Sequence, residues 1–153
     1  MHSAIISYNA ENISFTIKNK RILSDWVKEI AKRERKNIAI VSFIFCDDEF
    51  LLQLNNKFLQ HDTYTDIITF DFSVGGSISG DIFISIERVR ENAVNFSKPF
   101  KEELCRVMCH GILHLAGYSD KKNNEMPAMR AKEDDCLILL KEKFMFHVKH
   151  FNV

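Results

Sequence analysis

The stretch KEELCRVMCHGILHLAG, residues 101–117, carries the clearest helical pattern in this 153-residue chain. Its apolar residues recur three or four positions apart, as they do on the buried face of an amphipathic helix. These residues are Leu104, Val107, Met108, Ile112 and Leu115. Gly117 follows where such a helix would end, because glycine readily adopts the left-handed conformation of helix C-termini. We therefore predict a helix over about 99–116 that packs against the rest of the fold.

Two histidines on this helix are placed to share a ligand. His110 and His114 are four residues apart, so their side chains lie on one face of the helix. Zinc binds imidazole nitrogens at about 2.0–2.1 Å, a tolerance that a rigid helix meets well. After Gly117 the chain can turn back and bring the Asp120 carboxylate to the same ion. We predict a metal site at the end of this helix, with a fourth position open to water as in catalytic zinc sites.

The same histidine spacing occurs in zincin proteases, so a zinc peptidase is an alternative. In those enzymes a glutamate follows the first histidine and serves as general base. Here that position is Gly111, which cannot transfer a proton. The residues therefore favour metal-assisted hydrolysis of another substrate.

The other segments predict the rest of the fold. Residues rich in β-branched and aromatic types predict strands at 4–8, 13–17 (a second strand or part of one broken strand), 38–46, 66–73 and 80–86. Apolar periodicity predicts helices at 20–35, 87–97, 99–116 and 126–146. A further helix is predicted to begin at a cap formed by Asp47 or Asp48 and to run to Phe58. The continuous apolar run 38–46 is typical of a strand covered on both faces. We predict an α+β fold, with a single domain over 1–153 and a mixed sheet of about four strands packed by helices.

Composition is typical of a soluble globular protein, with 46% hydrophobic and 27% charged residues. No segment approaches the roughly 18 apolar residues of a membrane span, and the N-terminus lacks the features of a signal peptide. The four cysteines form no CxxC pair and are expected to be reduced thiols. Cys105 and Cys109 lie on the histidine helix but are predicted to be core residues. We expect a cytoplasmic protein without membrane contact.

Charge gives only weak guidance about partners. Lys plus Arg and Asp plus Glu each total 21, whereas nucleic-acid-binding proteins often carry a basic excess. Basic residues do gather locally, with eight Lys or Arg against three acids between Lys18 and Lys36. This run is a solvated helix face or a phosphate-binding patch, and the first interpretation is favoured.

The segment HGILHLAGYSD, residues 110–120, resembles the hallmark of the YbeY family, HGxLHLxGYDH. Upstream, LNNKFLQHDTYTDIITFDF (54–72) is similar to the family's LNxxYRxKDxPTNVLSF, and residues 80–82 match its GDI. Downstream, Met129 and Glu133 fit a family MxxxE pattern on the final helix. The resemblance covers about residues 54–133 and is most specific in the metal motif.

This resemblance implies a zinc-dependent endoribonuclease that acts on single-stranded RNA. It also implies roles in ribosomal RNA maturation, especially at the 3′ end of the small-subunit RNA, and in ribosome quality control, with ribosomal particles as partners. Cleavage by water and attack by the ribose 2′-OH both stay open. Besides the zinc peptidase, a non-catalytic ribosome-assembly factor whose metal stabilises the fold is a further alternative. The sequence does not determine the oligomeric state.

Three departures from the family pattern bear on the chemistry. Asp120 replaces the third histidine, and a carboxylate should make the metal a weaker Lewis acid and favour a harder ion. Ser119 occupies a position that is often Asp. The family's arginine in YRxKD falls on Leu59 and its lysine on His61, which removes a bidentate phosphate contact.

Five further residues are candidates for the reaction or for RNA contact. The candidate catalytic groups are His61 and Glu133. We expect His61 to replace part of the lost phosphate contact. Glu133 could orient a zinc-bound histidine or transfer a proton. The candidate RNA contacts are Arg106, Lys121 and Lys122, whose charges could steer a phosphodiester. An exposed loop histidine, a helix-surface carboxylate and ordinary surface cations are the alternative interpretations.

Overall fold

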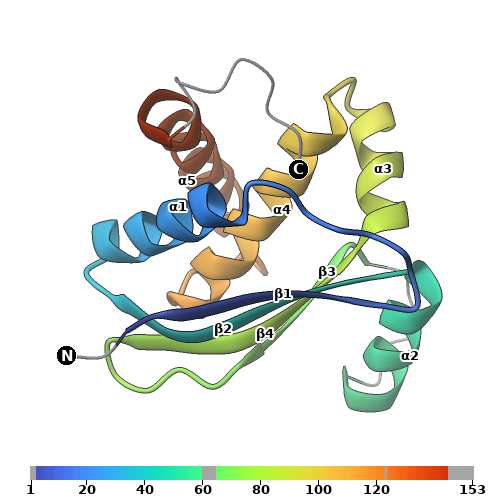
Figure 1. Cartoon of the computed structure of the whole chain (residues 1–153), viewed down its shortest axis with the longest axis horizontal. Coiled ribbons are helices and arrows are strands. Elements are labelled where there is room, and N and C mark those ends of the chain that lie inside the picture. Colours follow the sequence, from blue (N-terminus) through green and yellow to red (C-terminus); the bar gives the residue numbers. More distant parts are fainter. Residues whose placement is uncertain (1–2, 60–64, 123, 145–153) are drawn as a thin grey trace.

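The computed structural model of the chain describes residues 3–59, 65–122 and 124–144, and it has one mixed sheet with helices packed on it (Figure 1). The strands are β1 (Ile5–Glu11), β2 (Asn37–Cys46), β3 (Ile67–Asp71) and β4 (Ser77–Ser85), in the order β1-β2-β4-β3. The helices are α1 (Lys20–Arg33), α2 (Asp48–Leu59), α3 (Ile86–Asn95), α4 (Phe100–Leu115) and α5 (Glu125–Leu139), which a π-helical turn (Leu140–Phe144) extends. β1, β2 and β4 are parallel, and β3 is antiparallel to β4. The predicted α+β fold is confirmed.

Short-range signals in the sequence start and end these elements. The Asp47 carboxylate accepts a hydrogen bond of 2.8 Å from the backbone N–H of Phe50 and so caps α2, as predicted. The Ser85 hydroxyl accepts one of 3.1 Å from the Arg88 N–H and caps α3. Between β3 and β4 the chain turns at Gly75, whose φ of 59° suits glycine.

The predicted strand over 13–17 is wrong. β1 instead continues past residue 8 to Glu11, where its partner strand β2 also ends, at Cys46. Asn12 then has a φ of 62°, which directs the chain away from the sheet toward α1. Ile17 is buried although it belongs to no strand. Its apolar character therefore marks a core position and not a strand.

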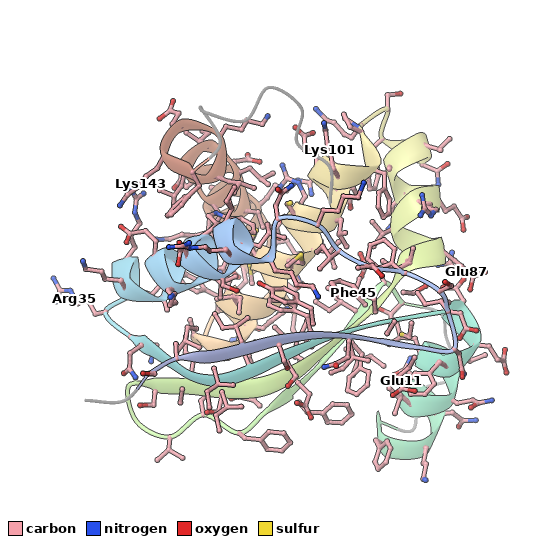
Figure 2. The ribbon with its side chains drawn as sticks, in the orientation of Figure 1. Glu11, Arg35, Phe45, Glu87, Lys101 and Lys143 are labelled. Atoms are coloured by element: carbon pink, nitrogen blue, oxygen red, sulfur yellow. The ribbon has the colours of Figure 1, made fainter. Side chains whose placement is uncertain are left out.

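The two faces of the sheet are covered unequally. Figure 2 shows side chains of the upper face, Phe45 among them, between the sheet and the helices. On the lower face α2 covers one end, where Leu51 packs with Cys46 and Ile68. None of the other helices in the described ranges lies over this face, and Ile40 in β2 is 55% exposed. The prediction that 38–46 is covered on both faces thus holds only at the end of β2 nearest α2.

The four cysteines are free and buried, as expected, and Cys105 and Cys109 belong to the core. The predicted helix over 126–146 corresponds to α5 and the π-helical turn as far as residue 144, and its last two residues lie outside the described ranges. None of the helices that the structure describes is long and apolar enough to span a bilayer.

α4 lies at the centre of the helical layer. It contacts α1, α3 and α5 on its outer sides and both β3 and β4 beneath. Two glycines allow the helix to approach the sheet closely. A Cβ on Gly111 would lie 2.9 Å from Ile82 Cγ2, and one on Gly80 would lie 2.5 Å from the carbonyl oxygen of Phe70 and 2.9 Å from Leu115 Cδ2. Since real Cβ atoms do not approach this closely, the packing of α4 on β3 and β4 depends on both glycines.

We therefore expect Gly80→Ala to lower the free energy of unfolding by about 1–3 kcal/mol, because a backbone oxygen cannot move aside as a flexible side chain can. Urea unfolding monitored by the fluorescence of Trp26, the single tryptophan, measures this change. Gly76→Ala is the matched control, since its Cβ would meet nothing within 4 Å. Equal stability of the two variants would show that the close approach at Gly80 is not required.

Candidate metal centre

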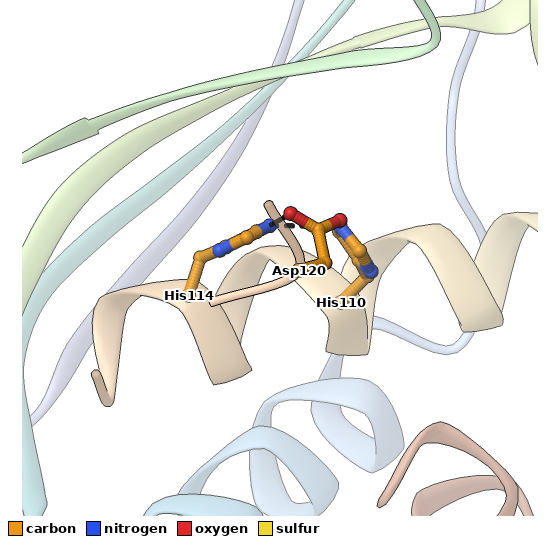
Figure 3. Close-up of side chains that lie close together, drawn as sticks. All are labelled: His110, His114 and Asp120. Carbon is orange, nitrogen blue, oxygen red and sulfur yellow. Dashed lines mark hydrogen bonds and ion pairs between the residues drawn. The ribbon is translucent and has the colours of Figure 1, made fainter. Parts of the chain in front are cut away.

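The end of α4 and the turn after it bring three predicted ligands together (Figure 3). Gly117 has a φ of 110°, and the N–H of Tyr118 donates to the Leu113 carbonyl at 3.0 Å, which closes the helix end. The chain then turns back along the helix. This return places Asp120 against His110 and His114, as the spacing predicted.

The ligand atoms of the three side chains face one another closely. The two Nε2 atoms of His110 and His114 are 2.9 Å apart. Asp120 Oδ2 is 3.3 Å from Nε2 of His110, and Asp120 Oδ1 is 3.6 Å from Nε2 of His114. Two atoms that each lie about 2.0–2.2 Å from one zinc ion are at most about 4.4 Å apart. The separations therefore fit a common ion, and these residues form a group of potential metal ligands.

Hydrogen bonds behind the rings fix which nitrogen faces that point. Nδ1 of His114 is 2.9 Å from the carbonyl oxygen of Tyr118. Because a carbonyl can only accept, the proton is on Nδ1 and the lone pair of Nε2 is free for a metal. Nδ1 of His110 is 2.6 Å from Glu133 Oε2, the carboxylate–histidine arrangement that is usual behind zinc ligands.

Burial and nearby charges have opposing effects on the pKa values of these groups. Burial by itself opposes the charged ring of His110, but its hydrogen bond with Glu133 and the carboxylate's charge raise its pKa overall. The pKa of His114 is lowered, first by burial and then by the nearby His110. Burial opposes ionisation of Glu133, yet His110 and Arg106 lower its pKa. Glu133 is therefore an ionised, buried acceptor for the His110 ring.

Arg106 holds this carboxylate in place. Its Nη1 donates to Glu133 Oε1 at 2.9 Å and its Nη2 donates to Asp134 Oδ1 at 2.6 Å. The Arg106 side chain is only 15% exposed, so these bonds are well shielded from water. RNA contact by Arg106 stays a prediction, whereas its contact with Glu133 is direct.

A second network fixes the turn that carries Asp120. The Tyr118 hydroxyl donates to Glu34 Oε1 at 2.6 Å, and Lys132 donates to the other oxygen of Glu34 at 3.1 Å. Glu34 caps the end of α1 and Lys132 belongs to α5, so the turn is tied to both helices. The carbonyl that orients His114 belongs to this same Tyr118.

An open cleft of about 790 Å³ lies between α3, α4 and α5. His110 and Asp120 lie on its wall, with Arg106 and Glu133 beside them. Two acids that the sequence did not single out also line it, Asp66 at the start of β3 and Glu103 on α4. The sequence could have predicted that Glu103 lies on the same side as His110, because it precedes His110 by seven residues and so shares its helix face. Nothing in the sequence brings Asp66 to the same place.

The remaining predicted site residues lie at varying distances from this cleft. Lys121 and Lys122 are exposed and directly follow Asp120. Their contact with RNA stays a prediction. His61 lies outside the described residues, and the same holds for residues 60–64 as a whole. None of the basic residues between Lys18 and Lys36 lines the cleft, which agrees with a solvated helix face.

Comparison with known proteins places this geometry in a family. The family model described as "Endoribonuclease YbeY" matches residues 5–141. The chain is 50% identical over 145 residues to the protein named Endoribonuclease YbeY of Flavobacterium psychrophilum, covering 95% of this chain and 99% of that protein. It is 49% identical over 142 residues to the protein of the same name from Cytophaga hutchinsonii, covering 92% and 99%.

A solved structure agrees with these sequence matches. The solution structure of TM1509 from Thermotoga maritima superposes with a TM-score of 0.66 at 27% identity, and the match covers 94% of each chain. The fold, the metal motif and the sequence matches along nearly the whole length lead to one conclusion. The chain belongs to the YbeY endoribonuclease family.

Proposed function

We propose that this protein is a zinc-dependent, single-strand-specific endoribonuclease. It acts in the cytoplasm on ribosomal RNA and ribosomal particles, in maturation of the small-subunit RNA 3′ end and in ribosome quality control. One observation carries the proposal. The free Nε2 positions of His110 and His114 and the Asp120 carboxylate converge on one point. Of these three residues, His110 and Asp120 line an open cleft. The names of the relatives supply the reaction class.

The donor set supports zinc as the ion. Two imidazole nitrogens and one carboxylate oxygen, each ring supported through Nδ1, are the ligands of many catalytic zinc sites. Three protein ligands leave room for a water or a phosphoryl oxygen. When bound there, zinc would supply Lewis-acid stabilisation of the negative charge that develops on the phosphoryl group.

The chain's own residues then have separate tasks. Glu133 keeps the proton on Nδ1 of His110 and holds the ring in position. The Tyr118 carbonyl does the same for His114. The cleft volume of about 790 Å³ lies within the range of small-ligand sites, about 300–1,000 Å³, and therefore accommodates an unpaired nucleotide. Lys121 and Lys122 would contact flanking phosphates, since both are exposed beside Asp120.

The packing of Gly111 opposes the peptidase alternative. The position that carries the general base in zincins is buried here against Ile82 and Ile67. A glutamate would not fit there without moving α4 off the sheet. Hydrolysis of RNA is thus better supported than hydrolysis of peptides.

We expect His110→Ala and His114→Ala to lose the bound ion and Cys109→Ala to keep it. The Cys109 thiol is buried and donates to the Arg106 carbonyl at 3.2 Å, away from the ligand group. Elemental analysis of each protein after dialysis against trace zinc measures the content per chain. Zinc retained by both histidine variants would show that these rings are not its ligands.

Glu133→Gln should weaken zinc binding by about 10–100-fold, because the neutral amide no longer stabilises the Nδ1–H tautomer as well as a carboxylate does. Competition with a chromophoric chelator measures the Kd. Asp134→Asn is the matched control, since Asp134 pairs with the same Arg106 but does not touch His110. Thermal unfolding of the metal-free proteins separates this effect from a loss of fold. If both variants bind zinc like the wild type, Glu133 does not orient the ring.

The activity itself is tested with the zinc-loaded protein and an RNA that carries the 3′ end of precursor small-subunit RNA. We expect cleavage in unpaired segments, protection of the same segment by a complementary strand, and loss of cleavage in His114→Ala. A new 3′-OH end indicates attack by water, whereas a cyclic phosphate indicates attack by the ribose 2′-OH. Undiminished cleavage by His114→Ala would refute the metal-dependent nuclease. Casein digestion by the wild type would favour the peptidase instead.

A further inference from the structure

Glu103 is a buried carboxylate without a partner in the cleft. It is only 5% exposed and lines the cleft wall. Its carboxylate forms no hydrogen bond or ion pair with any residue in the described ranges 3–59, 65–122 and 124–144. Its oxygens are not among the fully buried atoms that lack a hydrogen-bond partner, so they are reached from the open cleft. A carboxylate that is largely desolvated and has no donor from the protein favours a ligand that supplies one. A ligand that brings donors to this point would relieve the cost.

The position of Glu103 relates it to the metal centre. Seven residues separate it from His110 on the same face of α4, a distance of about 10 Å along the helix at 1.5 Å per residue. Val107 lies between them on that face and also lines the cleft. A phosphate at the metal end of the cleft would therefore leave its nucleoside directed toward Glu103.

The charges around Glu103 select the kind of ligand. Its pKa is raised, first by burial and then by the nearby Asp66, while the charges of Arg106 and Arg130 act in the opposite direction. The pKa of Asp66 is itself raised by burial. Arg106 and Arg130 are already paired with Glu133 and Asp134. The two carboxylates therefore favour a ligand with N–H donors over a phosphate. A second cation is less well supported, because His110, His114 and Asp120 form the one group of three potential metal ligands in the described part of the chain.

The walls of this end of the cleft suit a flat apolar ring. Ile67, Val107 and Met129 line the interior, and Phe96 and Met126 lie at the surface, 53% and 57% exposed. Exposed aromatic and apolar side chains stack on unpaired bases in single-strand-binding proteins. Asn92 adds an amide that can donate or accept.

We propose that the Asp66–Glu103 end of the cleft is a nucleobase subsite that prefers guanine. Guanine presents two adjacent N–H donors on its Watson–Crick edge, N1–H and the N2 amino group, which match the two oxygens of one carboxylate. Adenine and cytosine present a single amino donor there, and uracil flanks its one N–H with carbonyl oxygens that a carboxylate repels. This inference rests on the proposed RNA substrate and names the base that the cleft selects.

Direct binding tests the subsite without requiring cleavage. The zinc-loaded protein is titrated with 5′-GMP, 5′-AMP, 5′-CMP and 5′-UMP in separate calorimetric experiments. We expect GMP to bind about tenfold more tightly than the other nucleotides, which is the discrimination that one bidentate hydrogen-bonded pair provides. Glu103→Gln should abolish that preference, because the amide replaces one acceptor oxygen with a donor. Glu102→Gln is the matched control, since Glu102 pairs with Lys98 and Lys141 outside this cleft.

Asp66→Asn, which also reduces the negative charge of the subsite, is the second variant if Glu103→Gln does not fold. Wild-type protein that binds all four nucleotides equally, or Glu103→Gln that keeps the GMP preference, would overturn the proposal. Binding of two Mn²⁺ ions by the wild type and one by Glu103→Gln would also overturn it, in favour of a cation site.

Cleavage of oligouridine that carries one guanosine distinguishes failure of the subsite from failure of the nuclease. A second oligouridine carries an adenosine in place of the guanosine. Cutting at a fixed distance from the guanosine supports both the subsite and the nuclease, provided that the ratio of kcat/KM for the guanosine RNA to that for the adenosine RNA falls about tenfold in Glu103→Gln. Cutting without regard to the guanosine overturns the subsite and leaves the nuclease intact. GMP-selective binding that depends on Glu103, without any RNA cleavage, supports the subsite and overturns the nuclease.

Discussion

The close approach of α4 to β3 and β4 is the contact on which the rest of the structure depends. Gly111 and Gly80 leave no room for a Cβ between helix and sheet, so α4 has one position along the strands. The other helices then pack around a fixed α4. His110 directly precedes Gly111, so the same packing that buries Gly111 against the sheet also fixes where His110 meets the cleft. Core packing and site geometry thus have one common cause.

The candidate metal centre is held by two elements far from α4 in sequence or from each other, α1 and α5. Glu133 on α5 orients His110, and Arg106 fixes Glu133 in turn. Glu34 at the end of α1 holds Tyr118, whose carbonyl orients His114. This support matters because Asp120 lies on a turn and not on a helix. A ligand on a turn keeps its position only if the turn is tied to rigid elements, and here α1 and α5 provide them.

The charge distribution bears on how a neutral protein could act on RNA. The basic residues of α1 lie outside the cleft, and inside it the acids Asp66, Glu103 and Glu133 accompany Asp120. A divalent cation held by His110, His114 and Asp120 would offset part of that charge. Phosphate recognition would then depend on the ion and on lysines at the rim, while the acids toward Glu103 suit the N–H donors of bases. The replacement of the family's arginine by Leu59 is consistent with weaker reliance on phosphate contacts.

Local spacing was enough to predict α4 and the candidate ligand set. Helical periodicity placed α4, the four-residue interval put His110 and His114 on one face, and Gly117 ended the helix before Asp120. Only tertiary structure decided the rest. The end of β1 depended on where β2 ended, and the exposure of Ile40 depended on how far α2 reaches over the sheet. Glu34 and Asp66 reach the site from other elements. Glu133 does so too, and the sequence indicated it only through the resemblance to a known family. Side-chain contacts across such distances arise from packing, which no local pattern in the sequence encodes.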